Sequence, residues 1–258
     1  MLAQYKTNIN QLFPISMEVM KFSRSIKVMI QKMEFLAKNG VIHASKITKG
    51  EGKALVTLGE ILTEQPRNVT PHANELEAWC TKVARNTAKC SELARRFNQQ
   101  IVCVTNMIGK CVSRKDLGMV EVLSNLNLMQ PSEISTLINS PTLGTLDPLY
   151  RSNLTFIARR CQTNLTEILE LLKESLQFLK NAERSSQKIE GICVTAKYLA
   201  THISVEASNL STGNENFENL SSSIKDMIRR VEKDFNSMTD IIYQGAHLLE
   251  QLSTGGKK

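Results

Sequence analysis

The feature that most constrains the fold is a seam of small and medium apolar residues that repeats every 3.5 positions. Alternating steps of four and three residues from Val19 end at Ile47, and almost every step meets an apolar or small residue. The same steps from Ala182 end at Leu210. A repeat of 3.5 residues is typical of helices that pack along one another as coiled coils. The sequence therefore predicts long helices that bury one continuous stripe.

The two seams share one register, because Val19 and Ala182 lie 163 positions apart. Amphipathic helices resemble one another, so the seam alone is weak support for a repeat, but the spacing continues through a glycine-containing turn. We infer an internal duplication without a gap. Pairs with this spacing include Phe35 with Tyr198, Leu36 with Leu199, Ala37 with Ala200, Ala44 with Ala207, Gly50 with Gly213, and Ile61 with Ile224.

Glycines mark the two turns, which we expect near residues 48–52 and 211–215. Gly50, Gly52 and Gly213 interrupt otherwise continuous apolar periodicity. A tight helical hairpin needs residues that leave helical dihedral angles, and glycine adopts positive φ at little cost. We expect these glycines to form the tips of two antiparallel hairpins.

The chain divides on this pattern into a first hairpin, 1–113, an irregular connector, 114–148, a second hairpin, 149–253, and a short tail, 254–258. Pro66 and Pro71 are expected to interrupt the descending helix of the first hairpin, because proline lacks the backbone donor. Each hairpin leaves an apolar stripe uncovered. The predicted fold is all-α, with the two hairpins packed as a four-helix coiled-coil bundle, a pseudo-dimer from tandem duplication.

Composition supports an aliphatic helical core, with 41% hydrophobic but 5% aromatic residues and with 12 Gly and 6 Pro in 258 residues. The net charge of +7 is spread among acidic residues along the helices, which favours solvated faces over nucleic-acid binding. No apolar run approaches the roughly 18 residues that span a bilayer, and no secretory signal is present, so we expect a cytoplasmic protein. The six cysteines form no CxxC pair, and several fall on apolar helix faces, so we expect reduced thiols that serve as small hydrophobic residues.

Sequence motifs give catalysis little support. The four histidines lack HExxH spacing, and no GxSxG, Walker or GxGxxG motif occurs. Glu60 and Glu206 can be imagined as paired acids across the tips, but charged residues near helix turns are usually caps or surface. We expect no enzyme activity, no cofactor and no metal.

The tip sequences resemble a known family. "LAKNGVIHASK", followed by a glycine-containing turn and "ALVTLGEI", is similar to the cytoplasmic signalling tip of bacterial chemoreceptors, the methyl-accepting chemotaxis proteins. The resemblance covers about 35 residues around each tip; the chain departs from the family pattern at His43 and Asn209 and lacks a methylation-site pattern. In the first copy the family residue is kept at Leu36, Ala37, Asn39, Ile42, Ala44, Val56, Glu60 and Ile61, with the charge kept at Lys46, and in the second at Leu199, Ala200, Glu206, Ala207, Phe217 and Ile224.

This resemblance implies a non-enzymatic signalling scaffold whose tip binds a chemotaxis histidine kinase and its SH3-like coupling adaptor, and whose tip side chains associate with receptor bundles. By position, the partner-binding candidates are Lys46, Val56, Glu60, Ile61, Glu206, Phe217 and Ile224. Three of these, Ile61, Phe217 and Ile224, also lie on the packing stripe and are expected in the core, whereas the charged ones are candidates for a merely solvated surface. The alternative is a helical-bundle interaction adaptor or effector unrelated to chemotaxis. Exposure of Lys46, Glu60 and Glu206 together at one end would favour the first hypothesis.

Overall fold

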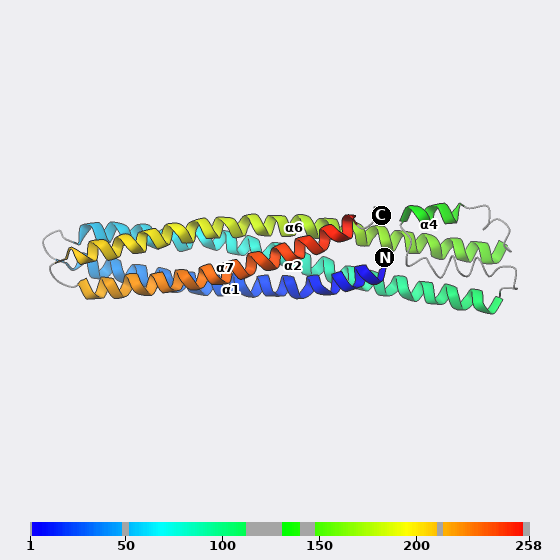
Figure 1. Cartoon of the computed structure of the whole chain (residues 1–258), viewed down its shortest axis with the longest axis horizontal. Coiled ribbons are helices and arrows are strands. Elements are labelled where there is room, and N and C mark those ends of the chain that lie inside the picture. The colour runs from blue at the N-terminus through cyan, green and yellow to red at the C-terminus, as the bar shows by residue number, and fades with distance from the viewer. Residues whose placement is uncertain (1, 48–51, 112–130, 140–147, 211–213, 255–258) are drawn as a thin grey trace. The chain divides into compact units, whose positions relative to one another are not determined.

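The computed structural model describes residues 2–47, 52–111, 131–139, 148–210 and 214–254. No strand occurs in these ranges, and the helices pack against one another, so the prediction of an all-α chain is confirmed. No helix in the described part of the chain is both long and apolar enough to cross a membrane. The helices are α1 (Leu2–Ser45), α2 (Lys53–Cys111), α4 (Pro131–Ile138), α6 (Pro148–Ser208) and α7 (Asn214–Thr254) (Figure 1).

The predicted seam is buried on both helices that carry it. Its positions from Val19 to Ala44 on α1 are buried, and so are those from Ala182 to Ala207 on α6 and Leu210 just past the end of that helix. Between the seam positions, both helices expose mainly polar and charged side chains. Burial of this apolar stripe stabilises such long helices more than intrinsic propensity does.

The stripe on α2 and the stripe on α7 match at a different spacing. Leu55 corresponds to Phe217 and Leu62 to Ile224 in the order of buried positions, and both pairs lie 162 residues apart. The ungapped pairing of Ile61 with Ile224 is therefore wrong, since Ile61 is 39% exposed and Ile224 is fully buried. Relative to the spacing of 163 on α1 and α6, the first hairpin has one more residue between its buried stripes than the second.

Helix α2 continues through both of its prolines, so the predicted interruption is wrong. Pro66 is itself buried, and Leu62, Val69 and Ala73 on the same face are at most 1% exposed. A proline removes one helical hydrogen bond and strains the preceding turn. Burial of the surrounding apolar face offsets that loss, while Pro71 lies on the exposed side, where water reaches the helix.

The chain forms two compact units, which we describe separately. Unit 2 consists of Ile15–Thr81 and Phe178–Gln244 and contains segments of α1, α2, α6 and α7. Figure 1 shows these four segments side by side within the unit. Side-chain contacts join each of the four segments to the next: Lys27 to Glu77 (2.5 Å), Glu75 to Ser185 (3.1 Å), Lys197 to Glu232 (2.8 Å) and Asp234 to Ser25 (2.9 Å).

The core of unit 2 mixes the two seams at matching levels. One cluster of buried residues includes Ile26 together with Ile189, its counterpart 163 positions later. A second cluster, closer to the turns, includes Ala37 together with Ala200. Residues with the same place in each seam therefore line the same part of the core.

Unit 1 consists of Met1–Pro14, Lys82–Gln177 and Gly245–Lys258. In its described part, α2 packs against α6 through an ion pair of 2.5 Å between Lys89 and Glu167, and the amide of Asn86 donates to the carbonyl of Leu171 at 3.3 Å. Helix α4 buries Ile134 completely.

Four cysteines serve as small hydrophobic core residues, as the sequence predicts. Cys80, Cys90, Cys161 and Cys193 are free and buried, whereas Cys103 is exposed. Desolvation raises the pKa of each buried thiol to about 12. These thiols stay protonated near neutral pH, so they are poor nucleophiles and poor metal ligands.

Candidate functional site

The two hairpins of unit 2 end in the same way, at an end of the unit that we call the tip. Helix α1 closes with 3.2 Å bonds donated by the backbone N–H groups of Lys46 and Ile47 to carbonyls three residues earlier, and the Ser45 hydroxyl donates to the Ile42 carbonyl at 2.8 Å. Such bonds satisfy carbonyls that a helix end would otherwise leave without donors. Helix α6 repeats all three bonds 163 positions later, from Asn209 and Leu210 at 3.2 Å and from Ser208 at 2.6 Å.

Gly52 is required at the first tip for close approach rather than for positive φ. Its backbone does not adopt the left-handed conformation that the sequence led us to expect, so that prediction is wrong. A Cβ atom there would lie 2.3 Å from the Ala44 carbonyl oxygen, at the end of α1. The start of α2 can therefore pass α1 because residue 52 has no side chain. Gly50 and Gly213 lie outside the described residues.

The charged candidates lie at the surface of the tip. Lys46 and Glu60 are exposed, and Glu206 is half-buried. Ala44, Ala207 and Leu55 belong to one core cluster, which places the ends of both hairpins at the same end of unit 2. Three charged candidates, two from the first hairpin and one from the second, thus lie at one end of one unit.

The apolar candidates divide between core and surface. Phe217 and Ile224 are 3% and 0% exposed, so they support the tip from inside. Val56 is half-buried and packs against the same cluster. Ile61 is exposed because Leu62 occupies the stripe position, which is a consequence of the extra residue in the first hairpin. An incoming partner can reach Ile61 but not the side chains of the two buried residues.

A groove between α1 and α7 near the tip escaped the sequence analysis. It has a volume of about 220 Å³, with Leu36 and Leu220 among its apolar lining. Because residue 40 has no side chain, Leu220 of α7 can approach α1 closely; a Cβ atom on residue 40 would lie 2.4 Å from Cδ2 of Leu220. Its polar lining consists of Asn39, His43, Asn216, Asn219 and Ser223. The clustered asparagines in "NENFEN" were the available signal, but their proximity to α1 depends on the fold.

This groove suits hydrogen bonding to a protein surface better than it suits a metabolite. Ligand cavities are usually about 300 to 1,000 Å³ and enclose most of the ligand. Asparagine amides both donate and accept, so they can bind peptide groups or polar side chains of a partner. The groove therefore extends the candidate partner surface from the tip along α1 and α7.

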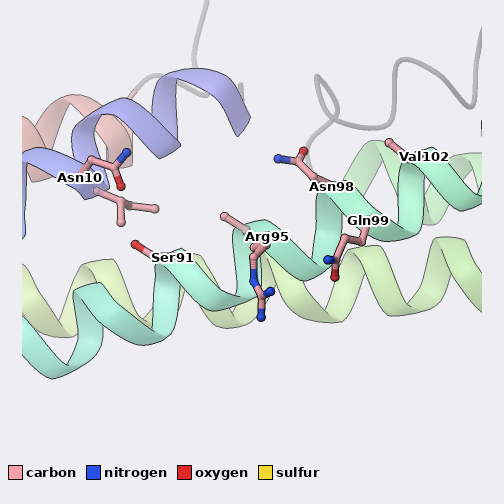
Figure 2. A pocket seen from close by; sticks show the side chains of 8 residues that line it. Asn10, Ser91, Arg95, Asn98, Gln99 and Val102 are labelled. Carbon is pink, nitrogen blue, oxygen red and sulfur yellow. The ribbon is translucent and has the colours of Figure 1, made fainter.

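A larger groove lies in unit 1, between the start of α1 and α2. It has a volume of about 470 Å³, and Ile9, Ala94 and Val102 supply its apolar lining. Figure 2 shows Asn10 on α1 and the other labelled residues on α2, with the Arg95 guanidinium directed away from Asn10. The groove thus offers mostly neutral polar groups around an apolar floor and has no arrangement that suggests a reaction.

Two carboxylates on α2 hold helices of unit 2 together. Hydrogen bonds from Lys27 and then Arg24, at 2.5 and 3.4 Å, hold the pKa of Glu77 below its ordinary value. Hydrogen bonds from His72 and then Ser185 lower the pKa of Glu75 in the same way. Both carboxylates are therefore ionised structural partners rather than proton carriers at neutral pH.

Among the described residues, no group of three or more His, Cys, Asp and Glu side chains is placed to hold a metal ion. No protein-family model, no curated protein and no solved structure matches this chain.

Proposed function

We propose that this chain is a non-enzymatic signalling scaffold, similar to the cytoplasmic part of a chemoreceptor, whose tip binds a chemotaxis histidine kinase and its coupling adaptor. In this proposal the four segments of unit 2 form an antiparallel four-helix coiled coil, and tandem duplication has put both halves of a receptor-like dimer into one chain. Both hairpins would then contribute to one partner surface.

One observation carries the proposal: the hydrogen bonds that close α1 recur 163 positions later at the end of α6, above a core that both seams line. A tandem duplication accounts at once for the repetition of the backbone closures, the serine bond and the core level at one spacing. The exposure of Lys46 and Glu60 at that end adds charges of both signs, which favours specificity and fast association with a partner whose charges are arranged to complement them.

The test is co-sedimentation of the full chain with the chemotaxis kinase and coupling adaptor of the same organism. We expect binding by the natural chain and loss of binding by a Glu60→Arg, Glu206→Arg variant. A matched control with the same change in charge is Glu18→Arg, Asp240→Arg, since both acids are exposed and lie away from the tip.

Equal loss of binding in both variants would contradict a tip-centred site. If no binding is detected with each protein at about 100 μM, the chemotaxis proposal is overturned. The remaining function would then be the alternative, an interaction adaptor or effector unrelated to chemotaxis.

A further inference from the structure

One outward face of α6 lacks charge over about five turns. We call it the α6 face, and it consists of the exposed residues on the side opposite the seam, with Lys197 beside it: Gly191, Val194, Thr195, Tyr198, Thr201, Val205 and, just past the end of the helix, Asn209. Solvent-facing positions of a helix normally carry charged and polar residues. On this face there is no Asp, Glu, Lys or Arg, and its apolar members Val194, Tyr198 and Val205 are 57%, 64% and 53% exposed.

Helix α1 provides an internal control for this face. Phe35, the counterpart of Tyr198 in the other repeat, is also 64% exposed. The equivalent outward positions nevertheless carry three lysines, two on α1 and one just past its end, and lysines beside exposed apolar groups oppose association. The counterparts of Lys32, Lys38 and Lys46 on the α6 face are Thr195, Thr201 and Asn209.

Gly191 is a second, independent observation on the same face. It is exposed in the middle of α6, and a Cβ atom there would meet nothing within 4 Å. An interior glycine costs a helix about 0.5 to 1 kcal/mol relative to alanine. No contact in the described part of the chain explains that cost, and the equivalent residue of α1 is Val28. A glycine on an outward face permits close approach of another backbone, which must come from outside this chain.

We infer that the α6 face is a self-association surface, on which α6 helices of two copies pack antiparallel about a two-fold axis at Tyr198. Gly191 and Val205 each lie seven residues from Tyr198. In this arrangement Gly191 of one copy faces Val205 of the other, so a large residue fills the space that a missing side chain leaves. The two Tyr198 rings meet at the centre, where aromatic residues contribute most to binding.

A second copy fits this face better than a charged partner does. Interface cores are depleted of charge and enriched in tyrosine, and two-fold dimers are the commonest assemblies of identical chains. The same contact on α1 would bring Lys32 and Lys38 of two copies together, with like-charge repulsion. This inference goes beyond the proposed function and does not depend on any partner at the tip.

The first test is sedimentation equilibrium of the full chain at up to about 200 μM. We expect a shift from the 28.9 kDa monomer to twice that mass as concentration rises. Tyr198→Glu should weaken dimerisation at least about 100-fold, because it buries a charge at the centre of the contact. Phe35→Glu is the matched control, with the same exposure in the other repeat, and should leave dimerisation unchanged.

The second test determines the direction of the helices. With Cys103 and Cys111 replaced by serine, a Gly191→Cys, Val205→Cys variant should form a reducible covalent dimer. Within one helix these positions are about 21 Å apart, too far for a disulfide. Efficient cross-linking of the single variant Gly191→Cys would overturn the antiparallel arrangement. A chain that stays monomeric throughout, or a dimer that survives Tyr198→Glu, would overturn the inference, and a monomeric chain would point to a different protein as the occupant.

Discussion

The two halves of unit 2 keep the same apolar core but treat their buried polar groups differently. In the first half the Ser23 hydroxyl donates to the Ala73 carbonyl at 2.9 Å, and Glu77 binds Lys27. The corresponding residues of the second half are Ser186 and Thr239, whose hydroxyls are the two buried side-chain groups without a hydrogen-bond partner in the described structure.

This difference shows that the fold requires the buried apolar residues but tolerates the loss of a single buried hydrogen bond. Each seam residue is buried in a core that both halves share, and removing even one methyl group from such a core lowers the free energy of unfolding. A single hydrogen bond contributes about 1 kcal/mol net, so its loss leaves the fold intact. Burial therefore holds both halves to the same apolar pattern, whereas the polar contacts between their helices are free to differ.

The largest effect should be equal in the two halves. Ile26→Ala and Ile189→Ala each remove a fully buried side chain from the same cluster and should each lower the free energy of unfolding by about 2 to 5 kcal/mol. Chemical denaturation of the two single variants measures both values. A loss in one half several times that in the other would show that the seams do not occupy equivalent places.

The next effect tests the difference between the hairpin ends. Gly52→Ala should destabilise the chain by about 1 to 3 kcal/mol, because the new Cβ collides with a backbone oxygen that cannot move alone. Gly191→Ala is the control, because it makes the same substitution where a Cβ atom has free space, and it should raise the free energy of unfolding by about 0.5 to 1 kcal/mol. If Gly52→Ala were neutral in thermal unfolding, close approach would not be what selects glycine there.

The paired serines should respond with opposite signs. Ser23→Ala removes a made hydrogen bond and should cost about 1 kcal/mol, whereas Ser186→Ala removes a buried hydroxyl without a partner and should be neutral or stabilising. Urea unfolding of both variants provides the comparison. Equal destabilisation by the two would contradict the difference between the halves.

The smallest effect depends on pH. Because Lys27 and Arg24 hold the pKa of Glu77 below its ordinary value, its contribution to stability is complete above the unfolded-state pKa and is lost as pH falls through the folded-state pKa. The contact is partly exposed, so Glu77→Gln should cost less than about 1 kcal/mol at pH 7 and much less in acid. Thr239→Val in the second half should show no such pH dependence in unfolding experiments between about pH 7 and 3.

The sequence predicted the helical class and the buried seam well, because burial and helical period together fix residues such as Ile26 and Ile189. The predicted interruption of the helix at Pro66 was wrong, because the free-energy cost of one lost helical hydrogen bond is smaller than the gain from burying the surrounding apolar face. The sequence also paired Ile61 with Ile224, since an insertion of one residue in a turn leaves no trace in an ungapped comparison. The groove at Asn39 and Asn216 required knowledge that α1 and α7, from opposite ends of the chain, lie together.

The extra residue in the first hairpin affects the stoichiometry with which a partner would bind the tip. Two identical subunits present two identical docking surfaces, and a partner binds them with a stoichiometry of two per dimer. Here the buried stripes match at 163 on one side of the turn and at 162 on the other, so the approximate two-fold symmetry of the core does not extend through the ends of the hairpins. Under the proposed function, a partner at the tip would meet two inequivalent surfaces, and saturation at one molecule per chain is the stoichiometry that this asymmetry favours.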